Sequence, residues 1–204
     1  MHVEFLVEEP STEAALDNLL PRMLPADVTF RLHNFQSKLT LLTQLPNRMK
    51  GYKHWLPADW RIVVLIDEDR ENCDQLKTKL EQAAGSAGLV TKSSASGQIS
   101  FQVLNRIAVE ELEAWFFGDV VAVVTAYPRV PLSLGKKEKY RDPDTIKGGT
   151  WEALERELQY YGYYSAGLPK IEVARNISKH MIPERNRSNS FRCFKNGIEA
   201  LIAA

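Results

Sequence analysis

The sequence predicts an α/β domain built on a mainly parallel sheet, and three observations support this fold class. Short apolar runs alternate with helical patterns, and the runs recur about every thirty residues. Residues 61–66 form the most apolar run and have the composition of a central strand that is covered on both faces. The chain of 204 residues, 44% of them apolar, suffices for one sizeable core.

The elements follow from apolar periodicity and from turn and capping residues. Strands are expected over residues 3–7, 28–35, 61–66 and 99–108. Ser11 or Thr12 is expected to cap the first helix, and the second helix is expected to end at Pro46. Later helices are expected over residues 71–84, from residue 110, and over 150–161, 170–181 and 190–203.

The chain is predicted to be a single domain with two parts. Residues 1–127 form the α/β core, and residues 128–204 form a linker and a helical appendage that packs on this core. The appendage has too little apolar material for a core of its own.

The net charge of zero conceals large local charges of both signs. Residues 28–58 and 170–195 each carry a net charge of +5, whereas residues 1–27, 59–81 and 107–127 carry −5, −3 and −4. Such blocks are compatible with an acidic pocket rimmed by positive charge, which suits a metal-dependent enzyme acting on a polyanion. The alternative is that each block is a solvated face.

Several classes of protein find no support in the sequence. There is no run of eighteen apolar residues and no signal-peptide pattern, so we expect a cytoplasmic protein with no membrane association. Cys73 and Cys193 stand alone, and the four histidines lack zinc-site spacing. No phosphate-binding GxxxxGK[ST] loop and no GxSxG nucleophile motif occurs.

Acidic residues follow two of the predicted strands. Glu8 and Glu9 come after the first strand, and Asp67 and Asp69 come after the third. Because parallel strands end at the same edge of a sheet, these side chains are expected to meet there. Asp67 and Asp69 project to the same side if the strand geometry persists between them. Glu8 with this pair would supply the oxygen ligands that Mg²⁺ prefers.

Other acids have simpler explanations. Acids just beyond a strand end can cap the next helix or complement its dipole, and this also applies to Glu110, Glu111 and Glu113. Asp119 lies in register with apolar positions, so we expect it to be partly buried with a partner.

Two stretches resemble the TOPRIM pattern of topoisomerases, primases and OLD-type nucleases. These are residues 5–13, which contain Glu8, and residues 63–70, which contain Asp67 and Asp69. A closer resemblance, supported by residues 106–116 and 187–191, is to the bacterial domain-of-unknown-function family 4276, which is regarded as TOPRIM-like. It implies a Rossmann-like three-layer sandwich with a C-terminal helical appendage.

The resemblance also implies roles for individual residues. Glu8 matches the TOPRIM glutamate, a general acid/base or metal ligand, and Asp67 and Asp69 match the metal-binding pair. Glu9 stands where a glycine is common, which bears on catalysis rather than on the fold. Glu111 and Glu113 match a family motif and are candidates for a second metal.

The resulting hypothesis is a Mg²⁺- or Mn²⁺-dependent, nuclease-type protein that processes phosphodiesters in nucleic acid, with a role in phage defence as one setting. Its candidate phosphate-binding residues are Lys147, Lys170, Arg185 and Arg187. One alternative is a non-catalytic interaction subunit of a complex that contains an ATPase. A second is a receiver-like phospho-acceptor with Asp67 as acceptor, although no late-strand lysine is evident.

Overall fold

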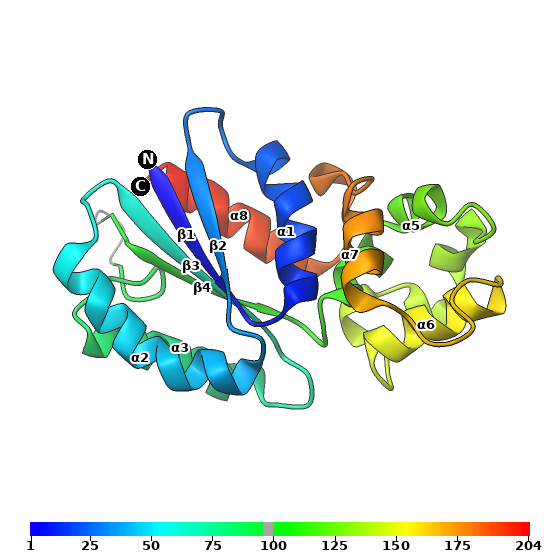
Figure 1. Ribbon diagram of the computed structural model, residues 1–204, viewed down its shortest axis with the longest axis horizontal. Helices are drawn as coiled ribbons and strands as arrows, with labels where there is room; N and C mark the ends of the chain where they lie inside the picture. The colour runs from blue at the N-terminus through cyan, green and yellow to red at the C-terminus, as the bar shows by residue number, and fades with distance from the viewer. Residues whose placement is uncertain (96–99) are drawn as a thin grey trace.

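The computed structural model describes residues 1–95 and 100–204, and its strands form an all-parallel sheet (Figure 1). The strand order is β2-β1-β3-β4. The strands are β1 (His2–Val7), β2 (Thr29–Asn34), β3 (Trp60–Asp67) and β4 (Val103–Ala108). The predicted α/β class is confirmed. Residue 99, where the fourth strand was expected to begin, lies outside the described residues.

The helices agree with the predicted order but not with every predicted boundary. They are α1 (Pro10–Met23), α2 (Lys38–Trp55), α3 (Cys73–Ser86), α4 (Glu113–Gly118), α5 (Val120–Ala126), α6 (Thr150–Tyr160), α7 (Lys170–Ser178) and α8 (Asn189–Ile202). Glu9, rather than Ser11 or Thr12, holds the N-cap position of α1. Helix α2 continues through Pro46, because residues on both sides of the proline keep one face buried: Leu41, Leu45, Met49 and Tyr52.

The two faces of the sheet bury different sets of side chains, which produces three layers. Alternate residues of β3 separate: Val63 and Leu65 pack on the side of α1 and α8, and Val64 and Ile66 pack on the side of α2 and α3. Figure 1 shows these helix pairs on opposite sides of the sheet. The expectation of a central strand covered on both faces is confirmed.

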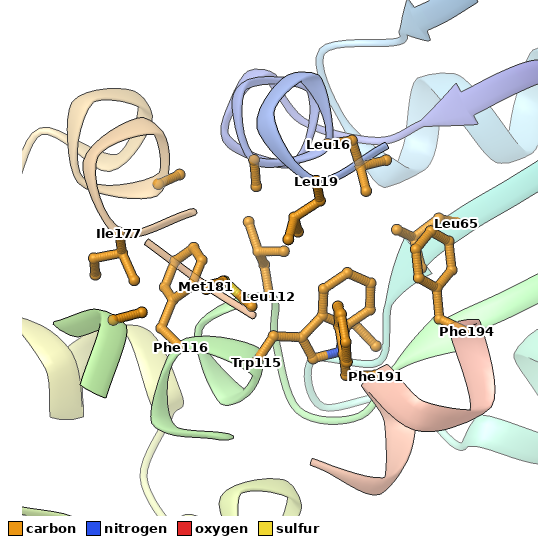
Figure 2. Close-up of a cluster of buried hydrophobic side chains, with 14 of the residues drawn as sticks. Leu16, Leu19, Leu65, Leu112, Trp115, Phe116, Ile177, Met181, Phe191 and Phe194 are labelled. Atoms are coloured by element: carbon orange, nitrogen blue, oxygen red, sulfur yellow. The ribbon is translucent and has the colours of Figure 1, made fainter. Parts of the chain in front are cut away.

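The C-terminal part of the chain shares the larger hydrophobic core. Figure 2 shows Leu19 of α1, Leu65 of β3, Trp115 of α4 and Phe194 of α8 in one buried cluster. Helix α8 packs along β4, while α4 to α7 lie beyond the carboxyl end of the sheet (Figure 1). These helices therefore form a wall next to the strand ends at which the acidic residues were predicted to meet.

The stretch 187–191, which supported the family resemblance, fastens α8 to this wall. Ser188 caps α8, and the Asp144 carboxylate accepts hydrogen bonds from the Ser188 hydroxyl at 2.8 Å and the Ser190 hydroxyl at 2.9 Å. The Ser190 hydroxyl also accepts a hydrogen bond from the Trp115 indole nitrogen at 2.9 Å. This stretch thus has a structural role. No helix in the described part of the chain has the length and apolarity needed to cross a membrane.

Candidate functional site

Three buried carboxylates gather at the carboxyl edge of the sheet. Glu8 follows β1, Asp67 ends β3, and Glu113 begins α4 a few residues after β4; they are 4%, 7% and 3% exposed. The backbone N–H of Asp67 donates a hydrogen bond to the Glu8 carboxylate at 3.0 Å. The parallel sheet therefore brings Glu8 and Asp67 together, as the sequence predicted.

These carboxylates lie in one electrostatic cluster. Burial and the nearby carboxylates of Asp69 and Glu9 raise the pKa of Glu8 to about 7. Burial and the charges of Glu8, Glu113 and Asp69 raise the pKa of Asp67 well above its usual range. Burial likewise raises the pKa of Glu113 to about 7. Perturbed carboxyl groups at the end of a parallel sheet are typical of functional sites.

Asp69 differs from its neighbour Asp67, because the strand geometry does not persist between them. Strand β3 ends at Asp67, and Asp69 adopts the left-handed conformation with φ of +53°. Its side chain, 44% exposed, forms an ion pair with Lys38 at the start of α2. Asp69 thus lies at the rim of the site while Asp67 lies inside it.

A second left-handed residue, Glu110 with φ of +61°, lies against this turn. The backbone N–H of Asp69 donates to the Glu110 carbonyl at 2.7 Å, and the Glu110 N–H donates to the Glu68 carboxylate at 3.2 Å. Non-glycine residues in this conformation cost roughly 1–2 kcal/mol each and concentrate at functional sites. The loops after β3 and β4 are therefore joined at a point of backbone strain.

Two lysines flank the carboxylates from different helices. Lys170, at the start of α7, lies 4.0 Å from the Glu9 carboxylate and over the ring of Trp151, and the nearby charges of Glu113 and Glu9 outweigh its burial and raise its pKa. The sequence predicted Lys170 but missed Lys38. The available signal was a lysine in the first turn of a helix, where the dipole disfavours a cation.

An acidic pocket of about 480 Å³ opens beside the cluster. Its charged lining consists of Asp69, Glu71, Glu110, Glu111, Glu152 and Arg70. Gly148 and Gly149 complete the wall, both with positive φ. A Cβ at Gly149 would lie 1.8 Å from the Glu152 carboxylate, so only glycine lets this side chain fold back. One buried oxygen of Glu152 has no hydrogen-bond partner within the described ranges.

The remaining predicted residues have separate surroundings. Glu111 accepts hydrogen bonds from the Trp151 N–H at 2.7 Å and the Thr150 hydroxyl at 3.0 Å, so it holds the start of α6. Arg185 forms a bidentate ion pair with Asp119 at 2.6 and 2.8 Å, which confirms that Asp119 is buried with a partner.

Arg187 is exposed beside Gly135, and Lys147 lines a different, smaller pocket. Of the four predicted phosphate-binding residues, only Lys170 lies among the charges that act on the buried cluster.

The residues at the edge fit a hard cation in their chemistry. Within residues 1–95 and 100–204, no three or more His, Cys, Asp or Glu side chains are grouped so as to hold a metal ion. Glu8, Asp67 and Asp69 nevertheless offer only carboxylate oxygens, the ligands that Mg²⁺ prefers. Burial and the neighbouring carboxylates raise the pKa values of Glu8 and Asp67 even with Lys38 close to Glu8, and a bound cation would relieve this repulsion.

Comparison with known proteins places the chain. The family model described as "Domain of unknown function (DUF4276)" matches residues 7–201. The chain belongs to this family. Neither the search of curated proteins nor that of solved structures gives a match. The matched range includes the whole acidic cluster, so the site is part of the DUF4276 domain.

Proposed function

We propose that this DUF4276 protein is a Mg²⁺- or Mn²⁺-dependent, nuclease-type protein that processes phosphodiesters in nucleic acid. The observation that carries the proposal is the meeting of Glu8, Asp67 and Glu113, buried and of like charge, at the carboxyl edge of a parallel sheet. Burying several carboxylates together costs stability unless a cation or a proton compensates them. The TOPRIM resemblance of Glu8, Asp67 and Asp69 gives the same assignment.

The chain's own residues divide the work in this proposal. A bound Mg²⁺ would neutralise charge on the phosphate and lower the pKa of water. Asp67 and Asp69, with Glu8, would hold the ion. The pKa of Glu8, about 7, suits a group that accepts and returns a proton near neutral pH. Lys38 and Lys170 flank the carboxylates and would neutralise the phosphate oxygens.

The test measures metal binding and cleavage in parallel. Mn²⁺ binding is followed by titration calorimetry, and cleavage of supercoiled, linear and single-stranded DNA is assayed with Mg²⁺ and with Mn²⁺. Asp67→Asn keeps the size of the side chain and is expected to weaken Mn²⁺ binding at least tenfold and to reduce cleavage at least a hundredfold. Asp59→Asn is the matched control, because Asp59 is an exposed aspartate at the amino end of β3.

The outcomes separate the hypotheses. Cleavage that is lost in Asp67→Asn and kept in Asp59→Asn supports the proposal. Tight Mn²⁺ binding without cleavage of any substrate would contradict the nuclease assignment and favour an interaction subunit that acts with a partner. Equal Mn²⁺ binding by the wild type and Asp67→Asn would contradict the proposal that Asp67 belongs to a metal site.

A further inference from the structure

A second pocket of opposite charge lies next to the acidic pocket. It has a volume of about 240 Å³, and its charged lining consists of Lys139, Lys147 and Arg156 against Glu138. The acidic pocket, in contrast, has five carboxylates against the single Arg70. We call the smaller one the basic pocket.

The two pockets share a wall. In the loop before α6, Ile146 and Lys147 line the basic pocket, and Gly148 and Gly149 line the acidic one. On α6 itself, Glu152 faces the acidic pocket and Arg156 faces the basic pocket. Residues four apart in a helix are offset by about 6 Å along its axis. The charge therefore reverses over about one helical turn.

The cations of the basic pocket are available to a ligand. Lys147 and Arg156 are exposed and have no ion-pair partner in the part of the chain that the structure describes. Lys139 is committed in part, because its ammonium lies 3.2 Å from the Glu157 carboxylate and over the ring of Tyr140. The pocket thus presents two free cations next to a region that repels anions.

We propose that the basic pocket binds a backbone phosphate of a nucleic-acid strand, one or two nucleotides away from the phosphodiester that reaches the acidic pocket. This rests on the proposed function. Phosphates advance about 3.4 Å per nucleotide along the axis of a duplex, and successive phosphates of one strand lie farther apart than this rise, so an offset of about 6 Å corresponds to one or two nucleotides. Because the acidic pocket repels phosphate unless a cation is bound, Lys147 and Arg156 supply the affinity that does not depend on metal.

The experiment measures binding of the full chain to a fluorescein-labelled single-stranded DNA of twenty nucleotides, by fluorescence anisotropy in EDTA at several salt concentrations. The double variant Lys147→Glu, Arg156→Glu is expected to raise Kd at least tenfold and, because one phosphate contact is lost, to reduce the slope of log K against log salt by about 0.7. The matched control is the double variant Lys50→Glu, Lys179→Glu, which reverses the same number of charges. Both lysines are exposed and lie outside the pocket, and the single variant Lys50→Glu is measured beside it. They are expected to change Kd less than threefold.

An affinity of the double variant equal to that of the matched double control would overturn the proposal. If the charge reversals prevent folding, as circular dichroism would show, the double variant Lys147→Gln, Arg156→Gln takes their place, with an expected threefold rise in Kd; an unchanged Kd would again overturn it.

The binding assay contains no metal, so it separates this proposal from the proposed function. Loss of binding in the pocket variants, together with no cleavage by the wild type, would keep the phosphate site and reject the nuclease assignment. Cleavage by the wild type with unaffected binding in the variants would do the reverse.

Discussion

Two glutamates in and next to the first strand are equally buried, but their pKa values are shifted in opposite directions. Glu4, within β1, and Glu8, just after it, are each 4% exposed. Burial alone would raise the pKa of Glu4, yet hydrogen bonds from Tyr52, His33 and His2 outweigh it and lower that pKa. The pKa of Glu8 is raised to about 7.

The difference lies in the partners. The Glu4 carboxylate accepts a hydrogen bond from the Tyr52 hydroxyl at 2.9 Å, and its oxygens also contact ring nitrogens of His2 and His33. Glu8 accepts one backbone hydrogen bond, and this bond and the charge of Lys38 do not outweigh its burial and the carboxylates of Asp69 and Glu9. Burial of a charge therefore does not by itself mark a candidate site; a buried carboxylate whose pKa stays raised, as that of Glu8 does, is the better candidate.

The largest expected effect is at Asp119, a buried carboxylate that has hydrogen-bonding partners, as Glu4 does. Asp119→Ala is expected to lower the free energy of unfolding by about 3–4 kcal/mol, because it leaves Arg185 without its ion-pair partner and removes the cap of α5. Urea unfolding at pH 7 measures it. Glu184→Ala, at an exposed position, is expected to change stability by less than about 0.5 kcal/mol. Equal effects of the two variants would contradict the distinction.

Glu4→Gln is expected to lower the free energy of unfolding by about 2 kcal/mol at pH 7, since an amide replaces the carboxylate that accepts hydrogen bonds from Tyr52 and the two histidines. The lowered pKa of Glu4 means that its contribution is present above the usual value of 4.5 and is lost as the pH falls below it. The difference in the free energy of unfolding between the wild type and the variant should therefore be smaller in urea unfolding at pH 3 than at pH 7. A gap that is constant with pH would contradict this account of Glu4.

Glu8→Gln is expected to do the opposite and stabilise the fold. A carboxyl pKa raised from 4.5 to about 7 means that the folded state loses stability as the pH rises through this interval. Removing the charge should gain about 1–3 kcal/mol at pH 8 and little at pH 4. Thermal unfolding at the two pH values checks this. A loss of stability at pH 8 would show that Glu8 is a paired residue like Glu4.

The smallest expected effect concerns the strained backbone at Glu110. Glu110→Gly is expected to be about 0.5–1 kcal/mol more stable than Glu110→Ala, because only glycine adopts φ of +61° without strain. Both variants remove the same charge, so their difference in urea unfolding isolates the backbone. Equal stability would mean that the turn relaxes when the side chain is shortened.

The predictable part of the fold and of the site comes from local patterns. Strand periodicity located the ends of β1 and β3, and the rule that parallel strands share an edge brought Glu8 and Asp67 together. Lys38 was missed because its position depends on how α2 packs, which no local pattern encodes.

Two outcomes depend on tertiary packing rather than on local sequence. Pro46 was expected to end a helix, but packing on both sides of it overrides the local preference. Arg185 was grouped with the phosphate-binding residues, yet Asp119, sixty-six positions earlier, holds its guanidinium. Spacing in sequence identifies such charges but not the partner each one finds.

The joined loops after β3 and β4 have a consequence for the entropy of ligand binding. The hydrogen bond between Asp69 and Glu110 fixes the backbone of both loops before any ligand arrives. A ligand that enters between them need not order two independent segments, a cost that otherwise reduces affinity. The two strained residues, Asp69 and Glu110, thus lie where the loops are already held in place before a ligand binds.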